Sequence, residues 1–160
     1  MVGEADDARL VVEFLNTVDI DEGIDLLATP AGYRQWATAH QLRAGDRRLA
    51  LELRDALRQL VRAGGATLPQ IALEVRTGSD GAPSLVGDDV AGGVLAAAVR
   101  LATRGEWRRL KLCPNPICLE AFWDRSKNRS RTWCAMTGCG NLLNARAYRA
   151  RRRDAQAGLT

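Results

Sequence analysis

The sequence has no hydrophobic run long enough to cross a membrane. Its longest apolar stretch, residues 94–99, is rich in alanine and ends at Arg100. A membrane span requires ~20 consecutive apolar residues. The N-terminal residues also lack the basic and apolar regions of a secretory signal. We therefore expect a cytoplasmic protein with no membrane partner.

The residue patterns of the common enzyme classes are also missing. We find no nucleophile beside a base, no phosphate-binding loop and no metal site with an open position. The single histidine, His40, lies far from the cysteines in the sequence, and its simplest interpretation is a solvated residue near a helix end. The sequence therefore predicts a protein that is not an enzyme.

What the chain does have is enough apolar material for one modest core and an uneven distribution of charge. It has 160 residues, 46% hydrophobic and 26% charged, which favours a folded protein over a disordered one. Residues 1–100 contain ten basic and fifteen acidic side chains (net −5), whereas residues 101–160 contain thirteen and four (net +9). A positive field in the last third is typical of a module that binds a polyanion. A genomic base composition that favours arginine is the alternative explanation.

Residues 1–105 are predicted to form a mainly α domain with one small β-hairpin, an α+β fold. An apolar run at residues 10–17 is interpreted as helix, although a buried strand has the same pattern. Thr29 and Pro30 are typical of the start of a second helix. Apolar residues at helical spacing from Asp46 onward then predict a third helix, which ends at Gly64.

In the remainder of this domain the hydrophobic pattern changes from helical spacing to a period of two. Ile71, Leu73 and Val75 recur at every second position, and with a short run at residues 84–86 they predict the hairpin. A fourth helix is expected to start after Asp88 or Asp89. The composition changes near residue 105, so we place the domain boundary there and expect residues 1–105 to fold independently of the following module, residues 106–160.

All four cysteines lie in that second module, as Cys113-x4-Cys118 and Cys134-x4-Cys139. Two such pairs can close a tetrahedral site for one Zn²⁺ ion per chain, and four thiolates leave no open position. The site is therefore predicted to be structural, in a segment with few large apolar residues. Disulfides or free thiols are the alternatives.

Two basic segments beside the cysteines are candidates for contact with double-stranded DNA. Between the pairs, cations alternate with hydroxyl and amide side chains, so an extended strand would place four cations on one face. Residues 141–153 contain no proline or glycine and predict an amphipathic basic helix. A solvated loop and a solubilising tail are the alternatives. The candidate DNA contacts are Arg125, Lys127, Arg129, Arg131, Arg146, Arg149 and Arg153.

The second module resembles a known zinc finger. It contains Cys-x4-Cys, then Asp-Arg-Ser-x-Asn-Arg-Ser-Arg-x-Trp-Cys-x-Met-x-x-Cys-Gly-Asn and a basic segment, a pattern similar to the CGNR zinc finger. Upstream, Val11-Val-Glu-Phe-Leu-Asn-Thr and Asp25-Leu-Leu-Ala-Thr-Pro resemble the ABATE domain, which accompanies this finger in bacterial proteins described as stress-induced transcriptional regulators. The resemblance implies a zinc-binding, DNA-binding regulator whose metal ligands are Cys113, Cys118, Cys134 and Cys139.

The resemblance leaves specific points open. Leu142 stands where the name-giving motif has arginine. If that arginine contacts a phosphate or a base, its loss weakens DNA binding by about 1–3 kcal/mol or alters the sequence preference. Asn16 and Thr17 either line a ligand pocket or form a buried hydrogen-bonded pair or cap. We expect the N-terminal domain to sense a small-molecule effector or to mediate self-association as a homodimer. The alternative function is a zinc-stabilised module that binds RNA or another protein.

Overall fold

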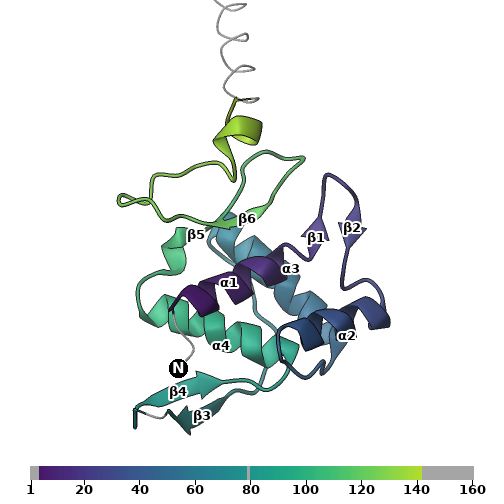
Figure 1. Cartoon of the computed structure of the whole chain (residues 1–160), viewed down its shortest axis with the longest axis vertical. Coiled ribbons are helices and arrows are strands. Elements are labelled where there is room, and N and C mark those ends of the chain that lie inside the picture. The colour runs from purple at the N-terminus through teal and green to yellow at the C-terminus, as the bar shows by residue number, and fades with distance from the viewer. Residues whose placement is uncertain (1–3, 79, 142–160) are drawn as a thin grey trace, which may run out of the picture.

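Four α-helices dominate the part of the chain that the computed structural model describes, residues 4–78 and 80–141 (Figure 1). The helices are α1 (Glu4–Leu15), α2 (Pro30–Ala39), α3 (Arg47–Ala63) and α4 (Val90–Thr103). The described residues also form three antiparallel hairpins: β1 (Val18–Asp19) with β2 (Ile24–Asp25), β3 (Glu74–Thr77) with β4 (Pro83–Val86), and β5 (Leu110–Leu112) with β6 (Ala121–Trp123). Two short helical segments are η1 (Trp107–Arg109) and η2 (Met136–Gly140). The predicted α+β class is confirmed.

Helices α2, α3 and α4 begin where the sequence predicts. The Thr29 hydroxyl accepts a hydrogen bond from the backbone N–H of Gly32, so α2 starts at Pro30. The carboxylates of Asp46 and Asp89 cap α3 and α4 in the same way. Gly64, at φ +73°, ends α3 in the left-handed conformation that glycine adopts without strain. These predicted helix boundaries are confirmed.

Helix α4 forms the centre of the core. Every residue from 90 to 98 is buried, and α1 and α3 pack against this helix. Gly87, in the segment before this helix, approaches it closely, because a Cβ at this position would lie 2.1 Å from the backbone carbonyl carbon of Gly92. No described helix is both long and apolar enough to span a membrane.

The structure corrects two local predictions in this half. It contains a second hairpin, β1–β2, which the sequence pattern missed because each strand is only two residues long. Strand β3 begins at Glu74, later than predicted, and Val75 is 68% exposed although the alternation assigned it to the apolar side. Ile71 and Leu73 do pack against the core, but from the segment before the strand.

His40 is not a solvated residue. Its ring stacks on Trp36 with the ring centroids 3.8 Å apart, and its Nε2 lies 2.8 Å from Oε2 of Glu13. Its Nδ1 lies 2.8 Å from the carbonyl oxygen of Trp36. The side chain therefore ties the end of α2 to α1.

The hydrophobic core crosses residue 105. Leu110 and Ala121, one from each strand of the β5–β6 hairpin, are buried in the same cluster as α1, α3 and α4. The Asn16 side chain, just after α1, donates from Nδ2 to the carbonyl of Ala121 (2.9 Å) and accepts from its N–H (2.7 Å). Arg58 of α3 donates to the carbonyls of Leu15 (2.7 Å) and Leu119 (2.9 Å). The division at residue 105 stays a prediction, but the packing does not stop there.

Replacement of Asn16 by alanine tests this attachment. Both hydrogen bonds to Ala121 are lost and its backbone N–H and carbonyl are left without these partners, so Asn16→Ala should lower the free energy of unfolding by about 2 kcal/mol. Urea unfolding followed by circular dichroism measures the change. The control Asn128→Ala removes an exposed amide and should change the stability by less than about 0.5 kcal/mol. Equal effects of the two substitutions would contradict the proposed attachment.

Candidate metal centre and basic loop

The four cysteines converge on one point although they come from separate segments. Their Sγ atoms all lie within 4.8 Å of one another, and those of Cys118 and Cys134 are 3.6 Å apart. Cys113 directly follows β5, and Cys118 lies just before β6. Cys139 lies in η2. Four tetrahedral ligands at the usual Zn–S distance of about 2.3 Å are separated by similar distances, so the arrangement fits a single metal ion.

Backbone hydrogen bonds shape the first cysteine pair. The N–H of Cys113 donates to the carbonyl of Glu120 (2.8 Å), which closes the end of the β5–β6 hairpin. The N–H groups of Cys118 and Leu119 both donate to the carbonyl of Asn115 (3.0 and 3.1 Å). The side chain of this buried asparagine turns to the second pair and donates to Sγ of Cys139 (3.3 Å). Asn115 therefore links the two cysteine pairs.

The thiols have different electrostatic surroundings. The hydrogen bond from Asn115 lowers the pKa of Cys139, whereas burial raises the pKa of Cys118 to about 11 and that of Cys134 further still. Sulfur ligands bind metals as thiolates, and a bound cation supplies the charge that stabilises them. Four clustered sulfur donors without a histidine or carboxylate among them are chemically suited to Zn²⁺.

The segment between the cysteine pairs folds around the carboxylate of Asp124, which is fully buried. Its oxygens accept hydrogen bonds from the backbone N–H of Ser126 (2.8 Å) and of Arg131 (2.9 Å), and from Nζ of Lys111 (2.7 Å). Lys111 Nζ also donates to the carbonyls of Arg129 (2.6 Å) and Arg131 (2.7 Å). We call residues 124–131, held in this way, the basic loop.

Asp124 is held in its charged form. Burial alone would raise the pKa of its carboxyl group. The hydrogen bonds from Lys111, Ser126 and Arg131 outweigh burial and hold this pKa well below its usual range. The buried negative charge is therefore matched by the Lys111 ammonium group and by backbone N–H groups at neutral pH.

The prediction of an extended strand for this segment is wrong. The basic loop contains turns, and Arg129 has φ +53°. Arg125, Lys127 and Arg129 are exposed, and their side chains form no hydrogen bond or ion pair with any other described residue. Arg131 differs, because its guanidinium donates to the carbonyls of Trp133 and Cys134 and lies 4.8 Å from the centroid of the Phe122 ring. Of the four cations predicted for this segment, only Arg125, Lys127 and Arg129 are therefore both exposed and without a partner among the described residues.

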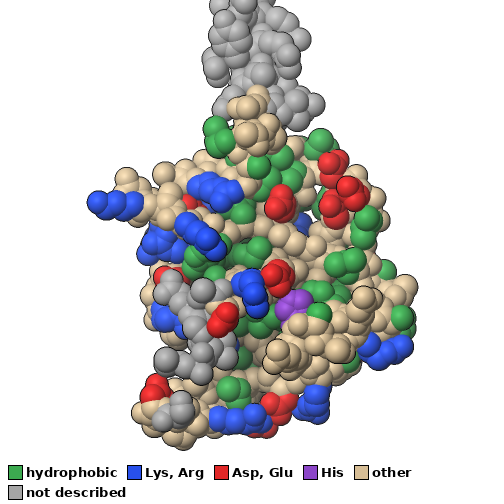
Figure 2. All heavy atoms as spheres, in the orientation of Figure 1, with side chains coloured by type: hydrophobic (Ala, Val, Ile, Leu, Met, Phe, Trp, Pro, Cys, Tyr) green, Lys and Arg blue, Asp and Glu red, His purple; other side chains and the backbone are tan. Residues whose placement is uncertain are grey.

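Cations gather on this side of the molecule. In Figure 2, Lys and Arg side chains lie over the region that Figure 1 assigns to β5 and the segment after β6. The predicted basic helix, with Arg146, Arg149 and Arg153, and the unusual Leu142 lie outside the described residues.

Asn16 and Thr17 have internal partners. Asn16 pairs with Ala121, as described above. The buried Thr17 hydroxyl donates to the carbonyl of Phe14 (2.7 Å) and accepts from Arg54 (3.0 Å), whose guanidinium also pairs with the carboxylate of Asp25 (2.7 and 2.8 Å). The two upstream motifs are thus joined through Arg54. A role for Asn16 and Thr17 in ligand binding stays a prediction.

Four residues with central roles were not predicted from the sequence: Asn115, Lys111, Asp124 and Arg58. Asp124 stands at the start of the quoted finger motif, a position that could have drawn attention to it. The other three gave no signal, because each acts on groups that are distant in sequence.

Comparison with protein families matches nearly the whole chain. Residues 8–111 match the model for the ABATE domain, described as "Putative stress-induced transcription regulator". Residues 109–152 match the model for the CGNR zinc finger. The two matches overlap in residues 109–111, at the start of β5. No curated protein matches the chain significantly.

Asp124→Asn should loosen the basic loop without emptying the metal site. The amide cannot balance the Lys111 charge or accept all three hydrogen bonds, so we expect trypsin to cleave after Arg125, Lys127 or Arg129 about fivefold faster or more. Metal content should stay unchanged, because Asp124 is not a ligand.

The matched control is Asp21→Asn, which removes an exposed carboxylate from the β1–β2 turn and should leave the cleavage rate unchanged. A cleavage rate in Asp124→Asn equal to that of the control would show that the carboxylate does not hold the loop.

Proposed function

Because the chain belongs to the ABATE family and carries a CGNR zinc finger, we propose that it is a zinc-dependent, DNA-binding transcriptional regulator. The family description supports a role in transcription, and the finger supports a metal-stabilised binding module. We propose no catalytic activity. In this proposal the N-terminal half senses a ligand or mediates self-association as a homodimer.

The proposed role of zinc is structural. One ion per chain, held by all four cysteines, would have no free coordination position and would supply no reaction chemistry. Asn115 would orient Cys139, and the β5–β6 hairpin would carry the first pair. The ion would then fix the start and the end of the segment that contains the basic loop.

The observation that carries the proposed DNA interface is the display of Arg125, Lys127 and Arg129. The three side chains extend from a loop whose backbone is fixed by Asp124 and Lys111, and none is neutralised by a described neighbour. Guanidinium and ammonium groups in this state are suited to phosphate oxygens. The net charge of +9 over residues 101–160 supports the same partner.

The first test concerns the metal. Protein purified without added metal should contain one zinc ion per chain by elemental analysis, and Cys134→Ser should lose most of it because three thiolates bind less tightly. Thr132→Ala, an exposed substitution two residues away, should keep its zinc. Metal-free protein with native dispersion of the Trp123 and Trp133 signals would contradict a structural ion.

The second test measures binding to duplex DNA. If about five phosphates are contacted, the logarithm of the duplex affinity should fall with the logarithm of salt concentration at a slope near −4 to −5. Replacing Arg125, Lys127 and Arg129 together by alanine should make the slope shallower by about 2.7 at unchanged zinc content. The control is a triple alanine variant of three exposed arginines in the other half, Arg34, Arg43 and Arg48, which should keep the slope.

Zinc-loaded protein that binds no duplex at about 50 mM salt would contradict the DNA-binding proposal. Tighter binding of single-stranded RNA than of duplex DNA would instead favour the alternative of an RNA-binding module.

A further inference from the structure

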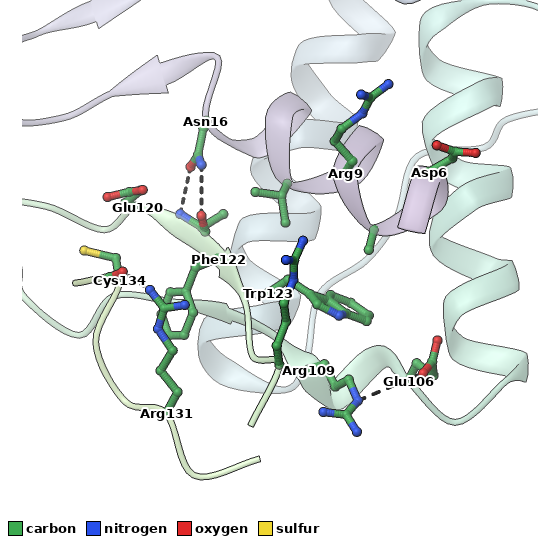
Figure 3. A pocket seen from close by; sticks show the side chains of 14 residues that line it. Asp6, Arg9, Asn16, Glu106, Arg109, Glu120, Phe122, Trp123, Arg131 and Cys134 are labelled. Atoms are coloured by element: carbon green, nitrogen blue, oxygen red, sulfur yellow. Dashed lines mark hydrogen bonds and ion pairs between the residues drawn. The ribbon is translucent and has the colours of Figure 1, made fainter. Parts of the chain in front are cut away.

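A cleft of about 1060 Å³ lies between α1 and the zinc-finger half (Figure 3). Arg9 and Val12 of α1 line one side, and the residues of β6 line another. Arg125, from the basic loop, also lines it. We call this space the junction cleft. Its volume is sufficient for a small organic molecule.

The junction cleft is lined by charges of both signs: the acidic Asp6, Glu106 and Glu120, and the basic Arg9, Arg109, Arg125 and Arg131. Glu106 lies within about 4 Å of both Arg104 and Arg109, and Arg109 also donates to the carbonyls of Asp124 and Ser126. Among the described residues Arg9 has one ion pair, a 3.8 Å contact with Glu13, and its side chain is 71% exposed. Arg125 has no hydrogen bond or ion pair within the described part of the chain. Two guanidinium groups from different walls are thus available to an anion.

The wall formed by β6 carries two aromatic side chains, Phe122 and Trp123. Phe122 is buried, and the Arg131 guanidinium already covers its ring. Trp123 is only partly buried, because it packs against the core while also lining the junction cleft. Its indole therefore offers a surface for the ring of a ligand.

We infer that the junction cleft binds a small planar aromatic anion, a carboxylate or a phosphate ester. The ring packs against Trp123, and the anionic group binds between Arg9 and Arg125. The junction cleft would be the place where the proposed regulator senses its ligand. Ligand binding itself does not depend on the proposed function, whereas the expected effect on DNA binding rests on it. Since Arg125 belongs to both sites, a bound anion neutralises one cation of the DNA interface and lowers duplex affinity.

Binding is measured first without DNA, by the shift of the Trp123 indole N–H signal on titration with salicylate or phenyl phosphate. The signal is assigned with Trp123→Phe. Both probes should shift it, and Arg9→Ala should weaken their binding about tenfold, because a charge-assisted contact is lost. Arg108→Ala is the matched control, since Arg108 is exposed near the hairpin but does not line the junction cleft.

The two probes distinguish a carboxylate from a phosphate ester as the preferred anion. Neutral benzyl alcohol and inorganic phosphate test the two halves of the inference. Benzyl alcohol that binds as tightly as salicylate would overturn the anion requirement, and inorganic phosphate that binds as tightly as phenyl phosphate would overturn the aromatic one. An unshifted Trp123 signal, or equal weakening by Arg108→Ala, would overturn the site itself.

The effect on DNA is measured separately. Saturating probe should lower the duplex affinity of the wild-type chain, whereas Arg9→Ala should keep its affinity without probe and respond less to probe. A shifted Trp123 signal in a protein that binds no duplex would leave the site in place and refute only the proposed regulator. Duplex binding without a probe response in Trp123 would refute only the site.

Discussion

The attachment of β6 to the end of α1 determines how the two halves of this protein are arranged. One side chain, Asn16, satisfies both backbone groups of Ala121, and Arg58 holds the carbonyl of Leu119 beside it. These contacts place the β5–β6 hairpin against the helical core and, with it, the first cysteine pair. The metal centre, the basic loop and the junction cleft all take their positions from this hairpin.

The second organising feature is the pair formed by Asp124 and Lys111. A buried carboxylate without partners would be unstable, but here backbone N–H groups and an ammonium group satisfy it. The same ammonium group holds two carbonyls of the basic loop. The loop therefore presents its cations from a fixed backbone, which reduces the conformational entropy that a phosphate contact would otherwise have to overcome. A solvated, mobile segment of the same composition would lack this advantage.

Much of the local structure could be predicted from the sequence, because it depends on short-range chemistry. The caps at Thr29 and Asp46 and the stop at Gly64 act within a few residues of their targets, and the spacing of the cysteines favours a closed thiolate site. The fold of the basic loop depends instead on Lys111, thirteen residues before Asp124, and alternation alone suggested a strand. The packing across residue 105 could not be predicted either, because Asn16 and Ala121 are 105 residues apart.

The finger and the helical half share one core, so a bound metal ion would stabilise both. The most direct measurement is native-state hydrogen exchange before and after removal of the metal by a chelator. We expect the amides of α1 to exchange faster after chelation, together with those of β6, because the hairpin that covers α1 loses its support. Unchanged protection of α1, with faster exchange confined to residues 113–139, would contradict the claim and show two halves that fold independently.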